Sequence, residues 1–215
     1  MHTAATVQQY SREVNALIIV SHPDEQSFSH AVARKAADAC RAAGMEVAFH
    51  SIYDEHFDPV LSGSELARQY SFEPLVQRYI EETRSTDHFI FVHPDWWSGP
   101  PALLKGWIDR VFRPGIAYDW VGEEFSEKSH VPLLTNRSAT VFIPTDRGED
   151  EPSAALPLFW TELCAYAGLD PLQVTVFPEV RRSSMRQRRT WLGEVSATVS
   201  RLVASADTQD TGSKP

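Results

Sequence analysis

Five short apolar runs recur along the chain and predict buried β-strands. The two strongest, Ala16–Val20 and His88–Val92, are apolar at nearly every position instead of alternating with polar residues. A continuous run of this length is typical of a parallel strand covered on both faces. The predicted strands are Val14–Val20, Met45–Ser51, Asp87–His93, Ser138–Thr145 and Leu172–Phe177.

Helical repeats of apolar residues separate these runs. Ser27 is a suitable N-cap and Gly44 a suitable left-handed stop for the helix between them, and Gly168 ends a helix over 154–167. A helix over 101–112 is apolar around an unusually broad part of its surface, which indicates more than one packing partner. Further helical segments are 65–84, interrupted near 71–74, and 184–204.

The segment 113–137 departs from this pattern. It shows no clear periodicity and holds Gly115, Gly122 and Pro132. We interpret it as a long excursion, and therefore as a functional or lid-like segment.

The alternation of strands and helices predicts an α/β fold with one parallel sheet. Five strands suit the flavodoxin-like order 2-1-3-4-5, with helices on both faces of the sheet. We assign residues 14–204 to one flavodoxin-like domain, residues 1–13 to an N-terminal extension and residues 205–215 to a disordered tail. In such sheets ligands bind at the carboxyl ends of the strands, which selects the loops 21–29, 93–100 and 144–152.

Composition narrows the functional classes. The 215 residues carry a net charge of -9, which argues against a nucleic-acid partner. The basic run at 181–189 reads as a solvated helix face, although one of its arginines meeting a cofactor phosphate is a second interpretation. Two cysteines exclude a disulfide framework and a thiolate metal cluster, and no apolar run has the length of a signal or a membrane span. We expect a soluble cytoplasmic protein without membrane insertion.

The loop after the first strand, Ser21–His30, contains no glycine and is neither a Walker loop nor a dinucleotide fingerprint. It leads into a helix, whose first backbone N–H groups lack helical partners. Together with the hydroxyls of Ser27 and Ser29, these groups are chemically sufficient to hold a phosphate. Ordinary capping by Ser27 explains the same residues without a ligand.

The loop after the third strand places two indoles, Trp96 and Trp97, side by side. We expect at least one of them to lie in the core, while the pair favours a planar ligand such as an isoalloxazine ring. In the loop after the fourth strand, Thr145, Arg147 or a backbone N–H would stabilise negative charge on a reduced flavin. The acidic residues there would oppose that charge, so we expect them to face solvent or to pair with Arg147; they are Asp146, Glu149, Asp150 and Glu151.

Three segments carry a resemblance to a known family: Ser21–His30, Phe57-Asp-Pro59 and His93-Pro-Asp-Trp-Trp-Ser-Gly-Pro-Pro-Ala-Leu-Leu-Lys-Gly-Trp-Ile-Asp-Arg-Val-Phe112. They resemble the NAD(P)H:quinone oxidoreductases of the flavodoxin-like fold, including the quinone reductase-like ancillary subunits of potassium efflux systems. The last segment is highly specific, and the resemblance covers about residues 14–204.

The resemblance implies a homodimer with FAD or FMN in each site and NAD(P)H as electron donor. It implies ping-pong hydride transfer through flavin N5 to a quinone-like acceptor, and a helix 101–112 that packs partly across the dimer. Carried over by position, the phosphate-holding residues would be His22, Ser27, Phe28, Ser29 and His30. The ring would be held by Pro94, Asp95, Trp96 and Trp97, and its pyrimidine end by Thr145, Asp146, Arg147 and Gly148.

This chain departs from the family pattern at two places. The family commonly has Thr-Thr-Gly-Gly where Pro144-Thr-Asp-Arg147 stands here. The Tyr and His that some members carry shortly afterwards have no counterpart in 151–160, so the catalytic acid and base are not assigned.

Two other functions fit parts of the sequence. His22-Pro23-Asp24 also resembles the motif of zinc-dependent sugar N-deacetylases, although no further histidine with the expected spacing follows. Alternatively, the domain is a non-catalytic regulatory or partner-binding subunit that keeps the fold but not the turnover. We rank both below the flavin-dependent oxidoreductase, for which no metal is expected.

Overall fold

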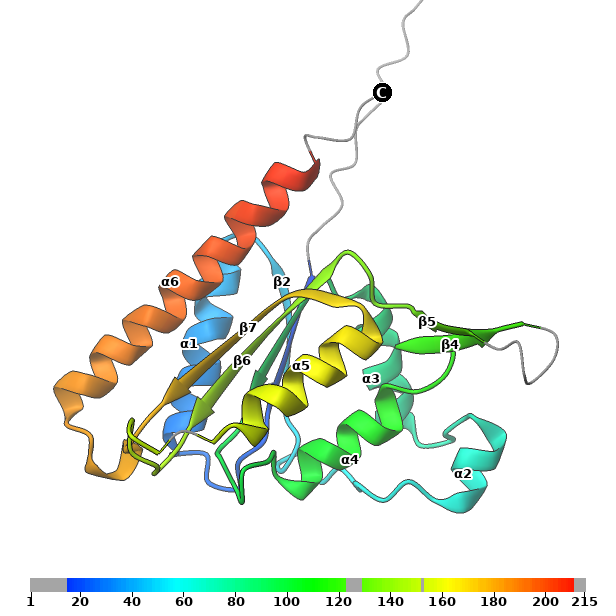
Figure 1. Cartoon of the computed structure of the whole chain (residues 1–215), viewed down its shortest axis with the longest axis horizontal. Helices are drawn as coiled ribbons and strands as arrows, with labels where there is room; N and C mark the ends of the chain where they lie inside the picture. The colour runs from blue at the N-terminus through cyan, green and yellow to red at the C-terminus, as the bar shows by residue number, and fades with distance from the viewer. Residues whose placement is uncertain (1–14, 123–128, 152, 211–215) are drawn as a thin grey trace, which may run out of the picture.

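The five predicted strands form one parallel sheet in the order β2-β1-β3-β6-β7 (Figure 1). The computed structural model describes residues 15–122, 129–151 and 153–210. Counting only the strands of this sheet, the order is the predicted 2-1-3-4-5. The strands are β1 Asn15–Val20, β2 Glu46–Ser51, β3 His88–Val92, β6 Arg137–Pro144 and β7 Leu169–Phe177.

The register places the carboxyl ends of the central strands at one level. Val20 of β1 pairs with Val92 of β3, and Val92 pairs with Phe142 of β6. The chain therefore leaves these three strands at the same edge of the sheet, so the loops selected from the sequence are neighbours in space. The arrowheads of β6 and β7 in Figure 1 point to this edge.

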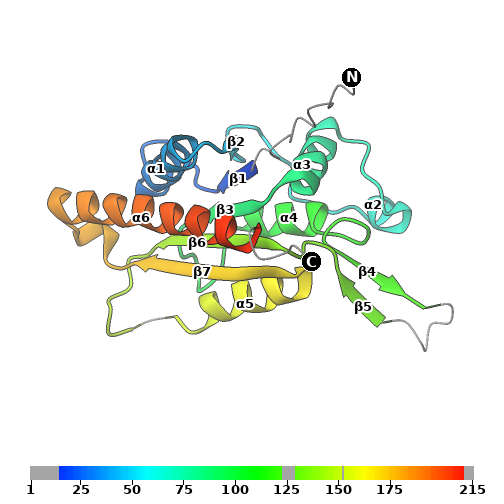
Figure 2. The same ribbon diagram turned by 90° about the horizontal axis from the view of Figure 1, so that it is seen from above.

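Helices cover both faces of the sheet, as predicted (Figure 2). Successive side chains of β1 point to opposite faces of the sheet. Leu17 and Ile19 therefore belong to one buried cluster, and Ile18 and Val20 to the other. The first cluster lies under α3 Pro74–Ser85, α4 Ala102–Val111 and α5 Ala155–Ala167, and the second under α1 Phe28–Ala42 and α6 Met185–Asp210.

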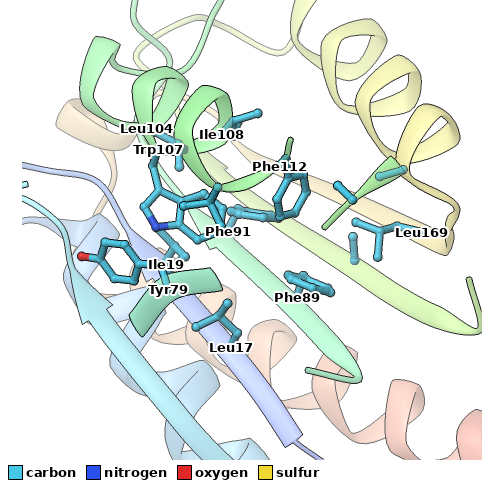
Figure 3. Close-up of a cluster of buried hydrophobic side chains, with 14 of the residues drawn as sticks. Leu17, Ile19, Tyr79, Phe89, Phe91, Leu104, Trp107, Ile108, Phe112 and Leu169 are labelled. Atoms are coloured by element: carbon cyan, nitrogen blue, oxygen red, sulfur yellow. The ribbon is translucent and has the colours of Figure 1, made fainter. Parts of the chain in front are cut away.

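The broad apolar surface of α4 is buried within the chain. Trp107 lies 5.8 Å from Tyr79 of α3 and 5.9 Å from Phe91 of β3, measured between ring centroids (Figure 3). Leu104, Ile108, Val111 and Phe112 are buried in the same cluster. The helix has several packing partners, but they belong to its own domain. These residues are therefore covered without a second copy of the chain, and the expected packing of the helix partly across a dimer stays a prediction.

The excursion 113–137 contains an antiparallel hairpin that the sequence did not reveal. Its strands are β4 Tyr118–Val121 and β5 Ser129–Pro132, while residues 123–128 lie outside the described residues. The rings of His130 and Tyr166 lie 3.9 Å apart between centroids, which fastens the hairpin to α5. Strands of four residues are too short for alternation to stand out, which explains the missed prediction.

Most predicted boundaries of the sheet strands lie within one residue of the observed ones, but the end of the last helix and the start of the last strand differ by more. The last helix, α6, continues to Asp210 because neither glycine nor proline interrupts residues 204–210, so residues 205–210 of the expected tail are helical. Strand β7 begins at Leu169, three residues early, since Pro171 hides its start in the sequence. The expected N-terminal extension, 1–13, and residues 211–215 lie outside the described residues.

The remaining helix is α2 Gly63–Arg68, which with α3 replaces the single interrupted helix pattern at 65–84. None of the helices among the described residues combines the length and the apolar composition needed to cross a bilayer.

Candidate functional site

The start of α1 offers backbone donors at the carboxyl edge of the sheet. Ser27 caps the helix, its Oγ accepting from the backbone N of His30 at 3.3 Å. Within the described residues, the backbone N–H groups of Phe28 and Ser29 have no hydrogen-bond partner. Both are first-turn donors of a helix of 15 residues, where the helix dipole favours an anion. The predicted phosphate-holding role of this segment thus fits its geometry.

Two of the residues predicted to hold phosphate act indirectly. The Phe28 ring packs 5.7 Å from both Phe177 and Trp191, so only its backbone is available at the helix start. The buried His30 ring has Nδ1 at 3.2 Å from Ser27 Oγ and Nε2 at 3.1 Å from Ser51 Oγ. Burial lowers the pKa of His30, so its ring is neutral and supports the cap instead of supplying a positive charge.

His22 connects the first loop with the second. Its ring lies 6.2 Å from the Trp96 ring and 6.4 Å from the His30 ring, measured between centroids. Its Nδ1 accepts from the backbone N of Asp24 at 3.0 Å, and the Asp24 carboxylate accepts from the backbone N of Gln26 at 2.9 Å. The residues of the His-Pro-Asp motif are therefore engaged in a local turn.

The second loop carries a tight turn from Trp96 to Gly99. The backbone N of each end residue donates to the carbonyl of the other, at 3.1 and 3.2 Å. The two central residues, Trp97 and Ser98, have φ angles of 57° and 60°. Positive φ at both central positions is the geometry of a type I′ turn, which usually takes Asn-Gly.

This turn overturns one expectation about the indoles. Neither lies in the core: the side chain of Trp97 is 100% exposed and that of Trp96 is 42% exposed. The turn leaves Trp97 fully exposed, which sequence spacing alone cannot show. Exposed indoles are costly in water, so this position suits a flat ligand surface.

His93, at the base of the second loop, was not among the predicted site residues. Its Nε2 accepts from Trp160 Nε1 at 3.1 Å, and because an indole nitrogen only donates, the proton sits on Nδ1 and is donated to the Pro94 carbonyl at 2.8 Å. Burial lowers the pKa of His93 to about 4, which keeps the ring neutral. No sequence signal links residues 93 and 160.

The third loop is joined to the second by charged groups. The Asp95 carboxylate accepts from Thr145 Oγ1 at 3.1 Å and from Arg147 Nε at 3.0 Å. The acidic residues of this loop are exposed, but Asp146, Asp150 and Glu151 also line the larger of the two hollows beside it. Arg147 pairs with Asp95 and not with these residues. Asp146 pairs with Arg181 at 2.9 Å, so this arginine of the basic segment contacts a carboxylate of the site loop.

Two hollows lie along the second and third loops and share Asp95, Thr145, Arg147 and Gly148 in their walls. The larger, of about 630 Å³, also takes in Trp97 and Asp146. The smaller, of about 280 Å³, extends toward Leu156 and Pro157 at the start of α5. The predicted ring-holding residue Trp97 and pyrimidine-end residues Thr145–Gly148 therefore surround one space, while residues of the first loop line neither hollow.

A metal site finds no support in this arrangement. Within the described parts of the chain, no group of three or more His, Cys, Asp or Glu side chains is placed to hold a metal ion. The zinc hydrolase alternative requires such a group around His22 and Asp24.

A buried charge network supports the end of β2 beside the first loop. His50, fully buried, has Nδ1 at 2.8 Å from Glu55 Oε1 and Nε2 at 2.6 Å from Glu82 Oε2. Burial acts to lower the pKa of His50, but the hydrogen bonds to Glu55 and Glu82 outweigh it and raise the pKa to about 8. The next residue, Ser51, holds His30.

The His50 network predicts a pH-dependent stability. The folded-state pKa lies above the unfolded value of about 6.5, so the stabilisation is fully present below about pH 6.5 and is lost as the pH rises through about 8. We expect a loss of about 1–2 kcal/mol in free energy of unfolding from this group between pH 6 and 9. Urea unfolding at both pH values should show that H50N removes this decrease and that H56N, at an exposed histidine, retains it. Equal slopes for the wild type and H50N would contradict the assignment.

Comparisons with known proteins agree with this geometry. The profile of a family described as having a flavodoxin-like fold matches residues 14–193. An uncharacterized NAD(P)H oxidoreductase of Haemophilus influenzae is 33% identical over 141 residues, which cover 64% of this chain and 67% of that protein. NAD(P)H dehydrogenase (quinone) 1 of Cavia porcellus is 34% identical over 154 residues, covering 59% of this chain and 55% of the enzyme.

The chain thus spans only about half the length of the Cavia porcellus enzyme. Among solved structures, an FMN-dependent NADH-azoreductase of Bacillus anthracis in complex with FMN superposes with a TM-score of 0.72 at 15% identity, covering 88% of this chain and 99% of that one. This likeness shows the fold.

The profile covers most of the chain, and the Haemophilus protein is a third identical over two thirds of its own length. The chain therefore belongs to the family of flavodoxin-like fold that contains the NAD(P)H:quinone oxidoreductases.

Proposed function

We propose that this protein binds FMN or FAD and transfers reducing equivalents from NAD(P)H to a quinone-like organic acceptor. The observation that carries the proposal is the row of ligand-binding features along one sheet edge. Unpartnered N–H groups at the start of α1 come first, then the exposed indoles of the second loop, then the hollow beside Thr145 and Arg147. A flavin needs these three features in this order: an anion site, a flat wall and donors at the pyrimidine end.

The residues present fit such a cofactor. Bound there, a flavin would supply hydride transfer through N5, first from the nicotinamide and then, in a ping-pong sequence, to the acceptor. Ser27, Ser29 and the backbone of Phe28 would bind the phosphate. Trp96 and Trp97 would provide the wall that excludes water from the ring.

Donors at the third loop would bind the other end of the ring. Thr145 Oγ1 and the Arg147 guanidinium would place hydrogen-bond donors and positive charge where reduction builds up negative charge. The relatives support this assignment, since they are named as NAD(P)H oxidoreductases and a quinone dehydrogenase, and the azoreductase structure contains FMN.

A non-catalytic role as a partner-binding subunit has one observation in its favour. In the third loop the family's small residues are replaced by Asp146 and Arg147, and Arg147 is already paired with Asp95 across the loops. If that pair closed the site, the fold would remain without turnover.

One experiment separates these functions. The absorption spectrum of the purified protein, with the released cofactor identified by mass, is expected to show FMN or FAD, and NAD(P)H consumption with a simple quinone is expected to exceed the flavin-only rate. Bound flavin without turnover over several acceptors would favour the subunit. Colourless protein that takes up neither flavin would refute the proposal, and stoichiometric zinc would revive the hydrolase.

The proposal includes a homodimer, which the resemblance implies, and a cytoplasmic location, which the composition led us to expect. Sedimentation velocity at micromolar concentration is expected to give twice the chain mass of 24.2 kDa, and a monomer would contradict this part.

A further inference from the structure

The Asp95 carboxylate is a buried junction between two loops. Its side chain is only 3% exposed. Oδ1 accepts from the backbone N of Ser98 at 2.9 Å, within the second loop. Oδ2 accepts from Thr145 Oγ1 at 3.1 Å and from Arg147 Nε at 3.0 Å, within the third. One carboxylate thus satisfies three donors from segments about 50 residues apart in the sequence.

Further hydrogen bonds close this junction into a ring. Arg147 Nη2 donates to Ser98 Oγ at 2.8 Å, and the backbone N of Arg147 donates to Thr145 Oγ1 at 3.1 Å. The two loops therefore hold each other in place. If Ser98 moved away from Asp95, Arg147 would also lose its hydrogen bond to Ser98 Oγ. Hydrogen bonds to a charged group are stronger than those between neutral groups.

The turn that presents Trp97 needs such a restraint. Trp97 and Ser98 both adopt the left-handed conformation, which is unfavourable for a residue with a side chain. The Asp95–Ser98 bond spans this turn and the fully exposed indole makes no core contact to hold it. The surrounding hydrogen bonds therefore have to fix the conformation.

Arg147 keeps donors available for a ligand. Its Nε and Nη2 are used by Asp95 and Ser98, whereas Nη1 has no partner within the described residues. The same side chain lines both hollows. A guanidinium fixed on one side and open on the other is oriented in advance toward whatever occupies the hollow.

We propose that Asp95 is a positioning residue, whose buried carboxylate sets the Trp97 turn and the Arg147 guanidinium as one unit for the planar ring bound between them. The inference rests on the proposed function for the identity of that ring. The coupling of the two loops is a property of the ligand-free protein. The proposal gives Arg147, one of the residues at which the third loop departs from the expected family pattern, a structural role through its pair with Asp95.

Hydrogen exchange on the flavin-free protein tests the coupling. We expect D95N to raise the exchange rate of amides in both 95–99 and 144–148 at least tenfold, and R147Q to do the same. D150N is the matched control, because it removes a carboxylate from the wall of the same larger hollow but contacts neither loop partner. An increase confined to one segment in D95N, or an equal increase in D150N, would overturn the coupling.

Flavin binding tests the positioning role. We expect D95N and R147Q each to weaken FMN or FAD binding at least tenfold, and the double variant to be no weaker than the stronger single one. At saturating flavin, D95N should also change the visible circular dichroism of the bound ring, which a loss of global stability would not do. Flavin affinity within twofold of wild type together with an unchanged spectrum would refute positioning. A wild-type protein that binds no flavin would refute the proposed function, while the exchange result would still decide the coupling.

Discussion

The variant R110M is expected to lose about 3–5 kcal/mol in free energy of unfolding. Arg110 lies on α4 with its side chain 1% exposed, and its guanidinium contacts Glu65 at 2.7 Å, Glu73 at 2.8 Å and the Asp58 carbonyl at 2.7 Å. Removing the cation leaves the Glu65 carboxylate buried, and among the described residues only Arg113, at 3.5 Å, remains to compensate it. An uncompensated buried charge is far more costly than the loss of an exposed ion pair.

Urea unfolding monitored by circular dichroism measures this loss. The matched control is K105M on the same helix, because Lys105 and Asp109 form an ion pair at 2.6 Å with both side chains about half exposed. Exposed pairs contribute about 0–1 kcal/mol, so K105M should unfold close to wild type. If R110M and K105M unfolded at similar urea concentrations, the Arg110 network would have no special structural role.

The Arg110 network shows where sequence patterns stop being informative. The repeat over 101–112 correctly indicates a helix with an unusual apolar face, and that face is buried as the pattern requires. The same pattern treats Arg110 as an ordinary polar position. Its partners, Glu65 and Glu73, lie 45 and 37 residues away, in a segment whose path depends on the whole fold. Gly106, on the same helix as Arg110, approaches Pro59 of a distant loop so closely that a Cβ atom would clash with it. This contact cannot be predicted from the sequence either, because the two segments share no local pattern.

The strands were predictable for a simple physical reason. A strand buried on both faces needs apolar side chains at consecutive positions, which stands out even in a single sequence. The three central strands, β1, β3 and β6, show this signal, whereas the edge strands β2 and β7 are only partly buried and were predicted from the alternation of strands and helices. The predicted order is that of the flavodoxin-like fold, and the structure has it. Knowing that parallel strands share a carboxyl edge was then enough to select the three site loops.

The interior of those loops was only partly predictable. Trp96 and Trp97 are evident as a pair, but their exposure depends on a left-handed turn that the residue types Trp-Ser do not suggest. Arg147 stands beside four carboxylates in the sequence, yet its partner is Asp95. Loop conformations are set by long-range hydrogen bonds, and these follow from the fold, not from neighbouring residues.

The variant S27D should separate the phosphate site from the stability of the helix that forms it. Aspartate caps a helix about as well as serine, and its charge interacts favourably with the helix dipole. We therefore expect flavin-free S27D to be at least as stable as wild type. A ligand phosphate at the N–H groups of Phe28 and Ser29 would instead meet a carboxylate on the adjacent residue. Like charges at about 4 Å repel by up to about 4 kcal/mol near a protein surface.

Flavin affinity should accordingly fall on the order of 100-fold in S27D, allowing for solvent screening of that repulsion. The matched control is S27N, which retains a capping side chain without the charge and should bind flavin within about threefold of wild type. Fluorescence titration of both variants with FMN and FAD, beside their urea unfolding curves, measures the two effects independently. Undiminished flavin binding by a stable S27D protein would place the phosphate elsewhere, because a phosphate at this helix end would be repelled by the added carboxylate.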